Sequence, residues 1–124
     1  MRTFKTKPFV RFAGRKSISD RALCEAVERI ENGLVDADLG GGIFKQRIAR
    51  TGQGRSRGLR AVLVLRRGEY AFFVHGFAKN DRENLRATEI KALRVLANEL
   101  LQLDKVGLDA MLANKTISEV NYDD

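Results

Sequence analysis

Three basic side chains, Lys45, Arg47 and Arg60, occupy positions where two expected strands would bring them onto one surface. Residues two apart on a strand share a face and lie roughly 6.5–7 Å apart, so Lys45 and Arg47 project together. If the segment that starts at residue 59 pairs with the segment 43–50, Arg60 joins them. Guanidinium groups suit bidentate binding of phosphate, and a lysine adds a compact positive charge. The spacing therefore predicts a binding site for a polyanion.

Positive charge is concentrated around these residues. The stretch 40–68 holds eight lysines and arginines and no acidic residue, although the chain has 16 acidic residues and a net charge of +7. Such a balance indicates an anionic partner: nucleic acid, an acidic protein or anionic lipid. A solvated hairpin tip that uses arginines to protect a sheet edge is the alternative. The missing acids favour polyanion binding, and we expect the Gly-rich segment between the strands to contribute Arg50, Arg55 and Arg57.

Several kinds of nucleic-acid chemistry are excluded by residue counts. With one histidine, His75, and one cysteine, Cys24, the chain has neither the residues of a two-histidine ribonuclease nor those of a Cys/His zinc site. The segment "GQGRSRG" is not a G-x-G-x-x-G motif, and no G-x-x-x-x-G-K-[ST] motif occurs. The few paired acids are interpreted as loop and capping residues. We therefore expect no metal and no nucleotide cofactor.

What remains is a metal-free site built from lysine and arginine. Crowding by like charge favours a neutral amine, so Lys45 beside Arg47 and Arg60 has a route to act as a base. Fixed guanidinium groups would stabilise the charge that develops on a phosphorane. The residues make phosphodiester cleavage feasible and leave plain binding open.

The chain length and the N-terminal sequence predict the number of domains and the cellular location. A chain of 124 residues predicts a single domain, residues 1–124. No run approaches the roughly 18 apolar residues of a membrane-spanning helix, and "MRTFKTKPFVRF" lacks the apolar core of a signal peptide. The single cysteine agrees with a reducing compartment. We expect a cytoplasmic protein that does not bind membranes.

The N-terminal part predicts one extended segment and one helix. Residues 4–12 are interpreted as extended, with Pro8 at an edge or a break. A helix follows in "SISDRALCEAVERIENG", capped by Ser19 and ended by Gly33. Its apolar residues recur at helical spacing, and the glycines of "VDADLGGG" indicate a loop after it. The apolar positions are Leu23, Val27, Ile30 and Leu34.

The central part predicts three consecutive strands. In "IFKQRIAR", Phe44, Gln46 and Ile48 alternate with the basic residues. "LRAVLVLRR" is typical of a central strand, and "RRGE" makes a tight turn into "YAFFVHGF". Short links imply an antiparallel meander. Strand alternation puts His75 on the face of Phe73, Phe77 and Lys79. Packing is its favoured role, and His75 stays a secondary catalytic candidate.

The C-terminal part predicts the longest helix, followed by a short helix and a strand. "KNDRENLRATEIKALRVLANELLQLD" carries an apolar stripe and a capping box of Asn80 and Glu83. "VGLDAMLANKTISEV" adds the short elements. The sum is an α+β fold in which an N-terminal helix and a long C-terminal helix pack on one face of a small antiparallel sheet. The other face, or the sheet edge, is left for function.

Two ordered stretches resemble a known family. "DLGGGIFKQRIARTGQGRSRGLRAVLVL" and "FFVHGFAKNDRENLRATEIKALRVLA" are similar to toxins of type II toxin–antitoxin modules, in the RelE/HigB-like superfamily. The shared pattern is D-x-G-G-G-x-x-K-x-R-x-A, then G-x-G-x-x-G-G-x-R, then G-F-x-K, over about residues 9–103. Arg57 stands where that branch usually has a second glycine. The helix–meander–helix order is similar to the compact RelE-like fold.

The resemblance implies a ribosome-dependent mRNA endoribonuclease that works without metal, blocks translation and is neutralised by a cognate antitoxin, expected to be a helix-turn-helix protein. It assigns stabilisation of the phosphorane to Arg60, acid or base function to Lys45 or Lys79, and phosphate binding to Arg47. Relatives of the RelE type also use a late tyrosine; here the candidates are Tyr70 and Tyr122. Because the superfamily includes ParE-type gyrase inhibitors, gyrase inhibition and non-enzymatic nucleic-acid binding stay open as alternatives.

Overall fold

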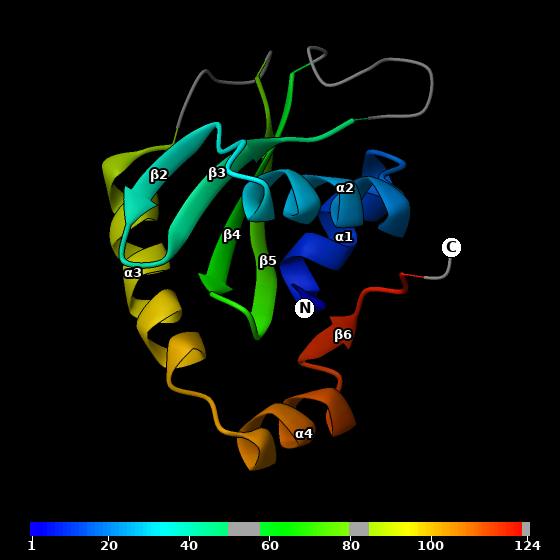
Figure 1. The fold of residues 1–124 in the computed structure, drawn as a ribbon, viewed down its shortest axis with the longest axis vertical. Coiled ribbons are helices and arrows are strands. Elements are labelled where there is room, and N and C mark those ends of the chain that lie inside the picture. The colour runs from blue at the N-terminus through cyan, green and yellow to red at the C-terminus, as the bar shows by residue number, and fades with distance from the viewer. Residues whose placement is uncertain (50–57, 80–84, 123–124) are drawn as a thin grey trace.

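A computed structural model describes residues 1–49, 58–79 and 85–122, which form an α+β fold around one six-stranded sheet (Figure 1). The strand order is β2-β3-β4-β5-β1-β6. The strands are β1 (Arg2–Thr6), β2 (Ala37–Gly40), β3 (Ile43–Arg47), β4 (Leu59–Arg66), β5 (Tyr70–Ala78) and β6 (Ile117–Glu119). The helices are α1 (Lys7–Arg15), α2 (Asp20–Glu31), α3 (Ala87–Leu101) and α4 (Lys105–Ala113).

The predicted antiparallel meander is confirmed. Strands β3, β4 and β5 pair antiparallel in sequence order, with β4 in the middle. The sheet is larger than predicted, because β2 pairs with β3 and because β1 joins β5 in parallel. The loop expected at residues 35–42 is therefore wrong in part. A parallel pair of strands distant in the chain leaves no local sequence pattern.

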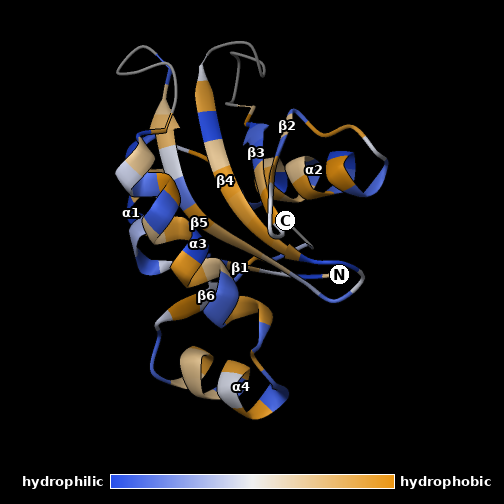
Figure 2. Ribbon diagram, turned by 90° about the vertical axis from the view of Figure 1, so that its left-hand side faces the viewer, coloured by the Kyte–Doolittle hydropathy of each residue, from blue (hydrophilic) through white to orange (hydrophobic). Residues whose placement is uncertain are grey.

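Helices cover both faces of the sheet, so the expectation of helices on one face is wrong (Figures 1 and 2). On one side, α1 and α2 pack against Leu63 and Leu65 of β4. On the other side, α3 packs against β4 in a cluster that holds Val62 and Val64, and α4 packs beside β6. Strand β4 is apolar at successive positions because both of its faces are buried. We call the two surfaces the α1 face and the α3 face.

The segment predicted as extended over residues 4–12 is half strand and half helix. It pairs as β1 only to Thr6, and α1 then begins with Pro8 in its first turn. Proline is tolerated there because the first N–H groups of a helix have no intrahelical partner. The ring of Phe12 packs on Gly76 so closely that a Cβ at position 76 would lie 2.2 Å from it. Aromatic packing thus decides where α1 sits.

The predicted helix cap is confirmed. The Oγ of Ser19 accepts a hydrogen bond from the N–H of Ala22, and Gly33 follows the helix with a φ of +82°. The expected apolar stripe stops at Ile30, because Leu34 lies beyond the helix and is 62% exposed. The helix therefore ends before Gly33, although the predicted apolar spacing runs on to Leu34.

The C-terminal elements agree with the predicted order. Helix α3 begins at Ala87, and the carboxylate of Glu89 accepts a hydrogen bond from the N–H of Arg86 at 2.8 Å. The predicted capping box of Asn80 and Glu83 lies outside the described residues. Helix α4 and strand β6 are the predicted short elements. Within the described part of the chain, no helix has the length and apolar character needed to cross a membrane.

Candidate functional site

The structure brings Lys45, Arg47 and Arg60 together on the α3 face. Arg47 of β3 is directly opposite Arg60 of β4, and Lys45 is opposite Val62. Opposed residues of an antiparallel pair project to the same side. Since Val62 belongs to the α3-face core, the three basic side chains share that face. The predicted convergence of these residues on two neighbouring strands is confirmed.

Lys79 extends this arrangement by one residue beyond β5. Its backbone N–H donates to the carbonyl oxygen of Gly58 at 2.5 Å, so the ladder between β4 and β5 continues past the assigned strands. Strand alternation then places Lys79 on the face of Phe77, which is opposite Arg60. We call Lys45, Arg47, Arg60 and Lys79 the basic face. Arg50, Arg55 and Arg57 lie outside the described residues.

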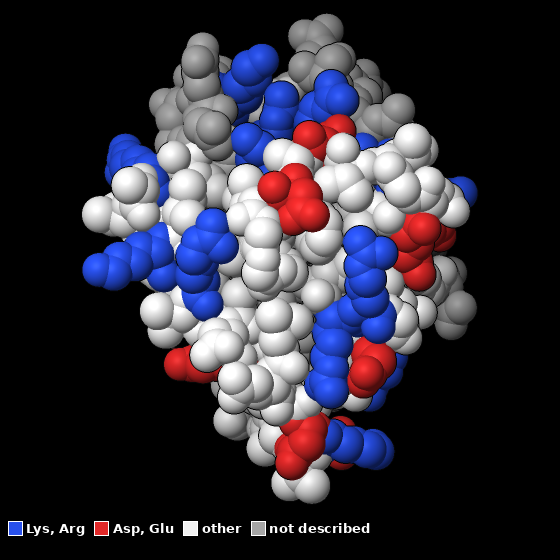
Figure 3. Space-filling view, turned by 60° about the vertical axis from the view of Figure 1, so that its left-hand side comes forward, with Lys and Arg blue, Asp and Glu red and all other residues white. Residues whose placement is uncertain are grey.

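The basic face lies at one end of the sheet, which we call its upper end. Lysines and arginines gather there in the space-filling view, beside residues that are not described (Figure 3). Val62 and Phe77 form a buried apolar floor with exposed fractions of 0% and 4%. Arg47 is exposed, and Arg60 is partly buried. The basic side chains thus lie above an apolar floor, and Arg47 is exposed.

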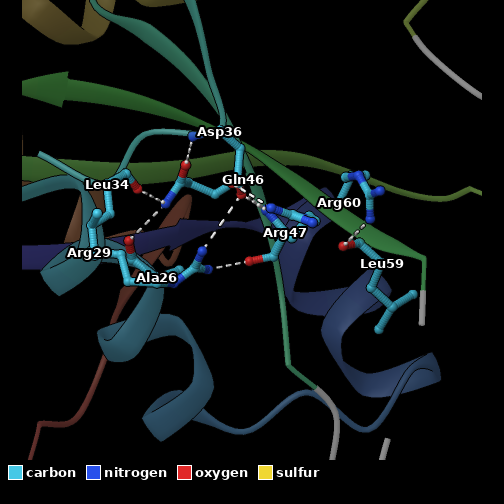
Figure 4. A network of polar contacts seen from close by, with 8 residues as sticks. All are labelled: Ala26, Arg29, Leu34, Asp36, Gln46, Arg47, Leu59 and Arg60. Atoms are coloured by element: carbon cyan, nitrogen blue, oxygen red, sulfur yellow. Dashed lines mark hydrogen bonds and ion pairs between the residues drawn. The ribbon is translucent and has the colours of Figure 1, made fainter. Parts of the chain in front are cut away.

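Arg47 is held in place by Asp36, which precedes β2 (Figure 4). One carboxylate oxygen accepts from the backbone N–H of Arg47 at 2.7 Å, and the other from its Nη2 at 3.2 Å. Arg29 of α2 pairs with the same carboxylate at 3.5 Å and donates to the carbonyl of Arg47. Burial raises the pKa of Asp36, but the hydrogen bonds and charge of Arg47 and the charge of Arg29 outweigh it and lower that pKa. Asp36 therefore stays ionised and orients Arg47.

Gln46 fixes the segment that carries Asp36. Its side chain is fully buried, and its Oε1 accepts from the N–H of Asp36 at 2.6 Å. Its Nε2 donates to the carbonyls of Ala26 and Leu34, both at 3.3 Å (Figure 4). The sequence predicted that Gln46 faces inward, but not that it joins α2, β2 and β3. Its only sequence signal is a polar residue at a buried strand position.

Arg60 is partly buried and lies opposite a second positive charge, that of Arg47. Burial lowers the pKa of Arg60, the charge of Arg47 lowers it further, and Asp36 opposes the shift. An anion bound between these two opposed guanidinium groups would offset the repulsion between their positive charges. A phosphate group with two exposed oxygens matches that requirement.

A β-bulge changes the position predicted for His75. The register between β4 and β5 shifts between Val62 and Leu63, so that Leu63 is opposite Phe73 but Val62 is opposite His75. Phe73 thus belongs to the α1-face core, while His75 joins Val62 on the α3 face. The prediction that His75 shares a face with Phe73 is wrong. The prediction that it shares a face with Phe77 is confirmed.

His75 also has a carboxylate partner that the sequence did not predict. Its Nε2 lies 3.5 Å from Oε2 of Glu89, and the two side chains are 28% and 24% exposed. Glu89 is on the first turn of α3, so the pair joins that helix to β5. Neither residue had a sequence signal for this contact, because the bulge and the helix position create it.

Neither tyrosine lies at the basic face. Tyr122 shares a hydrogen bond of 2.6 Å with the hydroxyl of Thr3, which pairs with Ala71 near the far end of β5. Tyr70 begins β5, more than roughly 20 Å from Phe77 at the usual rise per residue. The late tyrosine implied by the family resemblance therefore has no counterpart among the described residues of this site.

The described residues include no group of three or more histidine, cysteine or acidic side chains placed to hold a metal ion. Cys24 is buried, and burial raises the pKa of its thiol, which agrees with the packing role of a small apolar side chain. Among the described residues, the basic face offers amines and guanidinium groups, with the carboxylate of Asp36 beside Arg47 and the imidazole of His75 beside Glu89.

Residues 1–120 match the family described as "RelE toxin of RelE / RelB toxin-antitoxin system". A search of curated proteins gave no match. The family match covers all the described elements, including both strands of the basic face.

Proposed function

Because the chain belongs to the RelE toxin family of the RelE/RelB toxin–antitoxin system, we propose that it cleaves mRNA on the ribosome and thereby inhibits translation. The observation that carries this proposal is the pair Arg47 and Arg60, opposed on neighbouring strands above an apolar floor. Such a pair suits a phosphodiester, whose charge increases as the phosphorane forms.

The proposed reaction is a transesterification. The 2′-oxygen of a ribose attacks the adjacent phosphorus, the bond from phosphorus to the 5′-oxygen breaks, and a cyclic phosphate and a 5′-hydroxyl form. A base takes the proton of the 2′-hydroxyl, and an acid gives one to the 5′-oxygen. Arg60 stabilises the phosphorane and Arg47 binds a backbone phosphate oxygen. Lys45 or Lys79 supplies proton transfer, and Arg50, Arg55 and Arg57 contact RNA further along.

The family match implies a cognate antitoxin as a partner. We propose that acidic side chains of this antitoxin lie on the basic face and compete with mRNA for it, since complementary charge favours such an interface. The ribosome and its mRNA are the remaining proposed partners, which places the activity in the cytoplasm.

Mapping of RNA ends after a short induction tests this function. Wild type should stop growth and leave translated mRNAs cut within codons, whereas Arg60→Ala should leave them intact and permit growth. Arg21→Ala is the matched control, because Arg21 is an exposed arginine on α2, on the other side of the sheet. It should behave as wild type.

Intact transcripts in growth-arrested cells would contradict RNA cleavage. DNA breaks together with an SOS response would then indicate a gyrase inhibitor of the ParE type. Binding of nucleic acid without cleavage or gyrase poisoning would indicate a non-enzymatic module. Salt dependence does not separate these outcomes, because cationic binding of either nucleic acid weakens with salt.

A further inference from the structure

We propose that His75 is the general acid that protonates the leaving 5′-oxygen, and that Glu89 is the residue that positions it. This inference rests on the proposed RNA cleavage and assigns one of its two proton transfers. The sequence left His75 as a secondary catalytic candidate behind a packing role, and it predicted no catalytic role for Glu89.

The first support is the place of His75 across the sheet. Val62 has Lys45 opposite it on β3 and His75 opposite it on β5. Since strands are about 4.8 Å apart, the two backbone positions flank β4 at a separation of roughly 9.6 Å. Arg60 is the next β4 residue on the same face, so a phosphate that it holds over Val62 would have Lys45 on one side and His75 on the other.

This placement matches the geometry of phosphoryl transfer. The attacking and leaving oxygens lie roughly in line on opposite sides of phosphorus. A base and an acid must therefore approach from opposite sides of the phosphate. Lys45 on one side and His75 on the other meet this requirement, which gives Lys45 the role of base and His75 that of acid.

The second support is the anchoring of Glu89. Its Oε1 accepts from the N–H of Arg86 at 2.8 Å, which leaves Oε2 to contact the His75 imidazole at 3.5 Å. A carboxylate beside a histidine favours the charged imidazolium, the form that carries the proton an acid must donate. The fixed carboxylate also limits rotation of the ring.

The third support is access to solvent. His75 lines an open cavity of about 290 Å³ between α1 and β5, so a donated proton is replaced from water. Among the described residues, the charged groups that contact the imidazole or line its cavity are Glu89 on α3 and Arg11 and Arg15 on α1. Arg60 on β4 and Lys45 on β3 share its face of the sheet at a greater distance.

A substrate with a bridging sulfur distinguishes a general acid from a residue that has only a structural role. Sulfur replaces the 5′-oxygen at the position located by end mapping, in mRNA on programmed ribosomes. An alkoxide leaves well only when protonated, whereas a thiolate needs no acid because a thiol has a pKa near 8.5. We expect His75→Gln to cleave ordinary RNA about 10²–10⁴-fold more slowly than wild type. On the sulfur substrate, it should cleave within about tenfold of wild type.

Two variants complete the comparison. Arg60→Ala should be slow on both substrates, because the phosphorane needs its charge with either leaving group. Glu89→Gln should show a smaller loss than His75→Gln on ordinary RNA, also rescued by sulfur. If His75→Gln is slow on both substrates, or as fast as wild type on ordinary RNA, the assignment of His75 is wrong.

The wild-type protein gives the same test without a variant. A general acid makes the cleavage rate fall as pH rises through its deprotonation, and sulfur substitution should remove this alkaline fall. An alkaline fall that persists with sulfur would overturn the assignment. If wild type cleaves neither substrate, the proposed function itself fails, which is distinct from failure of the acid assignment.

Discussion

The upper and lower halves of the α3 face use the same strands for opposite purposes. In the lower half, Val64 and Phe72 are fully buried under α3, whose Leu93, Ala97 and Leu100 cover them. In the upper half, the same strands carry Arg60 and His75 beside the apolar floor of Val62 and Phe77. One continuous sheet thus supplies a core at one end and a cationic surface at the other.

The comparison shows how a small domain keeps charged groups in a fixed arrangement. Opposed arginines repel each other, and a loop would let them separate. Here their backbones are fixed by a sheet whose lower half is packed on both faces, and Asp36 and Gln46 brace the strand that carries Arg47. We therefore expect changes in the lower half to alter stability and changes in the upper half to alter activity.

The largest effect on folding is expected from Phe72→Ala. Phe72 is fully buried and stacks on Phe4 at 5.3 Å between ring centroids, so its removal leaves a cavity. We expect a loss of about 3–5 kcal/mol in the free energy of unfolding, measured by urea denaturation. A loss below about 1 kcal/mol would show that the lower half is not the stabilising part of the face.

A smaller loss is expected from Gln46→Leu. The substitution puts an apolar side chain of similar size at this buried position and leaves the N–H of Asp36 and two carbonyls without their partner. We expect a loss of about 1–3 kcal/mol in the free energy of unfolding. The control Gln102→Leu, at an exposed position, should change it by less than about 0.5 kcal/mol. Equal effects of the two variants would refute the bracing role of Gln46.

The smallest effect is a pH dependence at Asp36. Its pKa in the folded protein lies below the ordinary value of 3.8, so the folded state favours the ionised carboxylate. The resulting stabilisation is complete above the unfolded pKa and is lost as pH falls through the folded pKa. Asp36→Asn lacks it, so the difference between wild type and this variant should shrink from about pH 4 downward. A difference that is constant from pH 7 to pH 2 would contradict this explanation.

Local patterns predicted the elements that local chemistry determines. Ser19 and Gly33 bound the helix that became α2, and the alternation around Lys45 and Arg47 gave the correct faces of β3. These features depend on residues a few positions apart. The convergence of Arg60 followed from a short connection between adjacent strands, which antiparallel pairing makes the simplest solution.

Contacts between distant segments were not predictable in the same way. The α1 segment looked extended because Pro8 and the phenylalanines fit a strand, and only packing on Gly76 explains the helix. The bulge lies within the apolar run Phe72, Phe73 and Val74, where shifting the register by one residue buries equally apolar side chains. The alternation of β5 correctly placed His75 on the face of Phe77 and Lys79, but it could not show that the bulge turns Phe73 to the other face.

The most direct test of the division between the two halves is the single-turnover rate of mRNA cleavage on programmed ribosomes by purified Arg60→Ala, with its thermal unfolding midpoint measured on the same sample. We expect the rate to fall about 10²–10³-fold or more, while the midpoint stays within a few degrees of wild type. A folded Arg60→Ala that cleaves at the wild-type rate would contradict a catalytic role for the basic face.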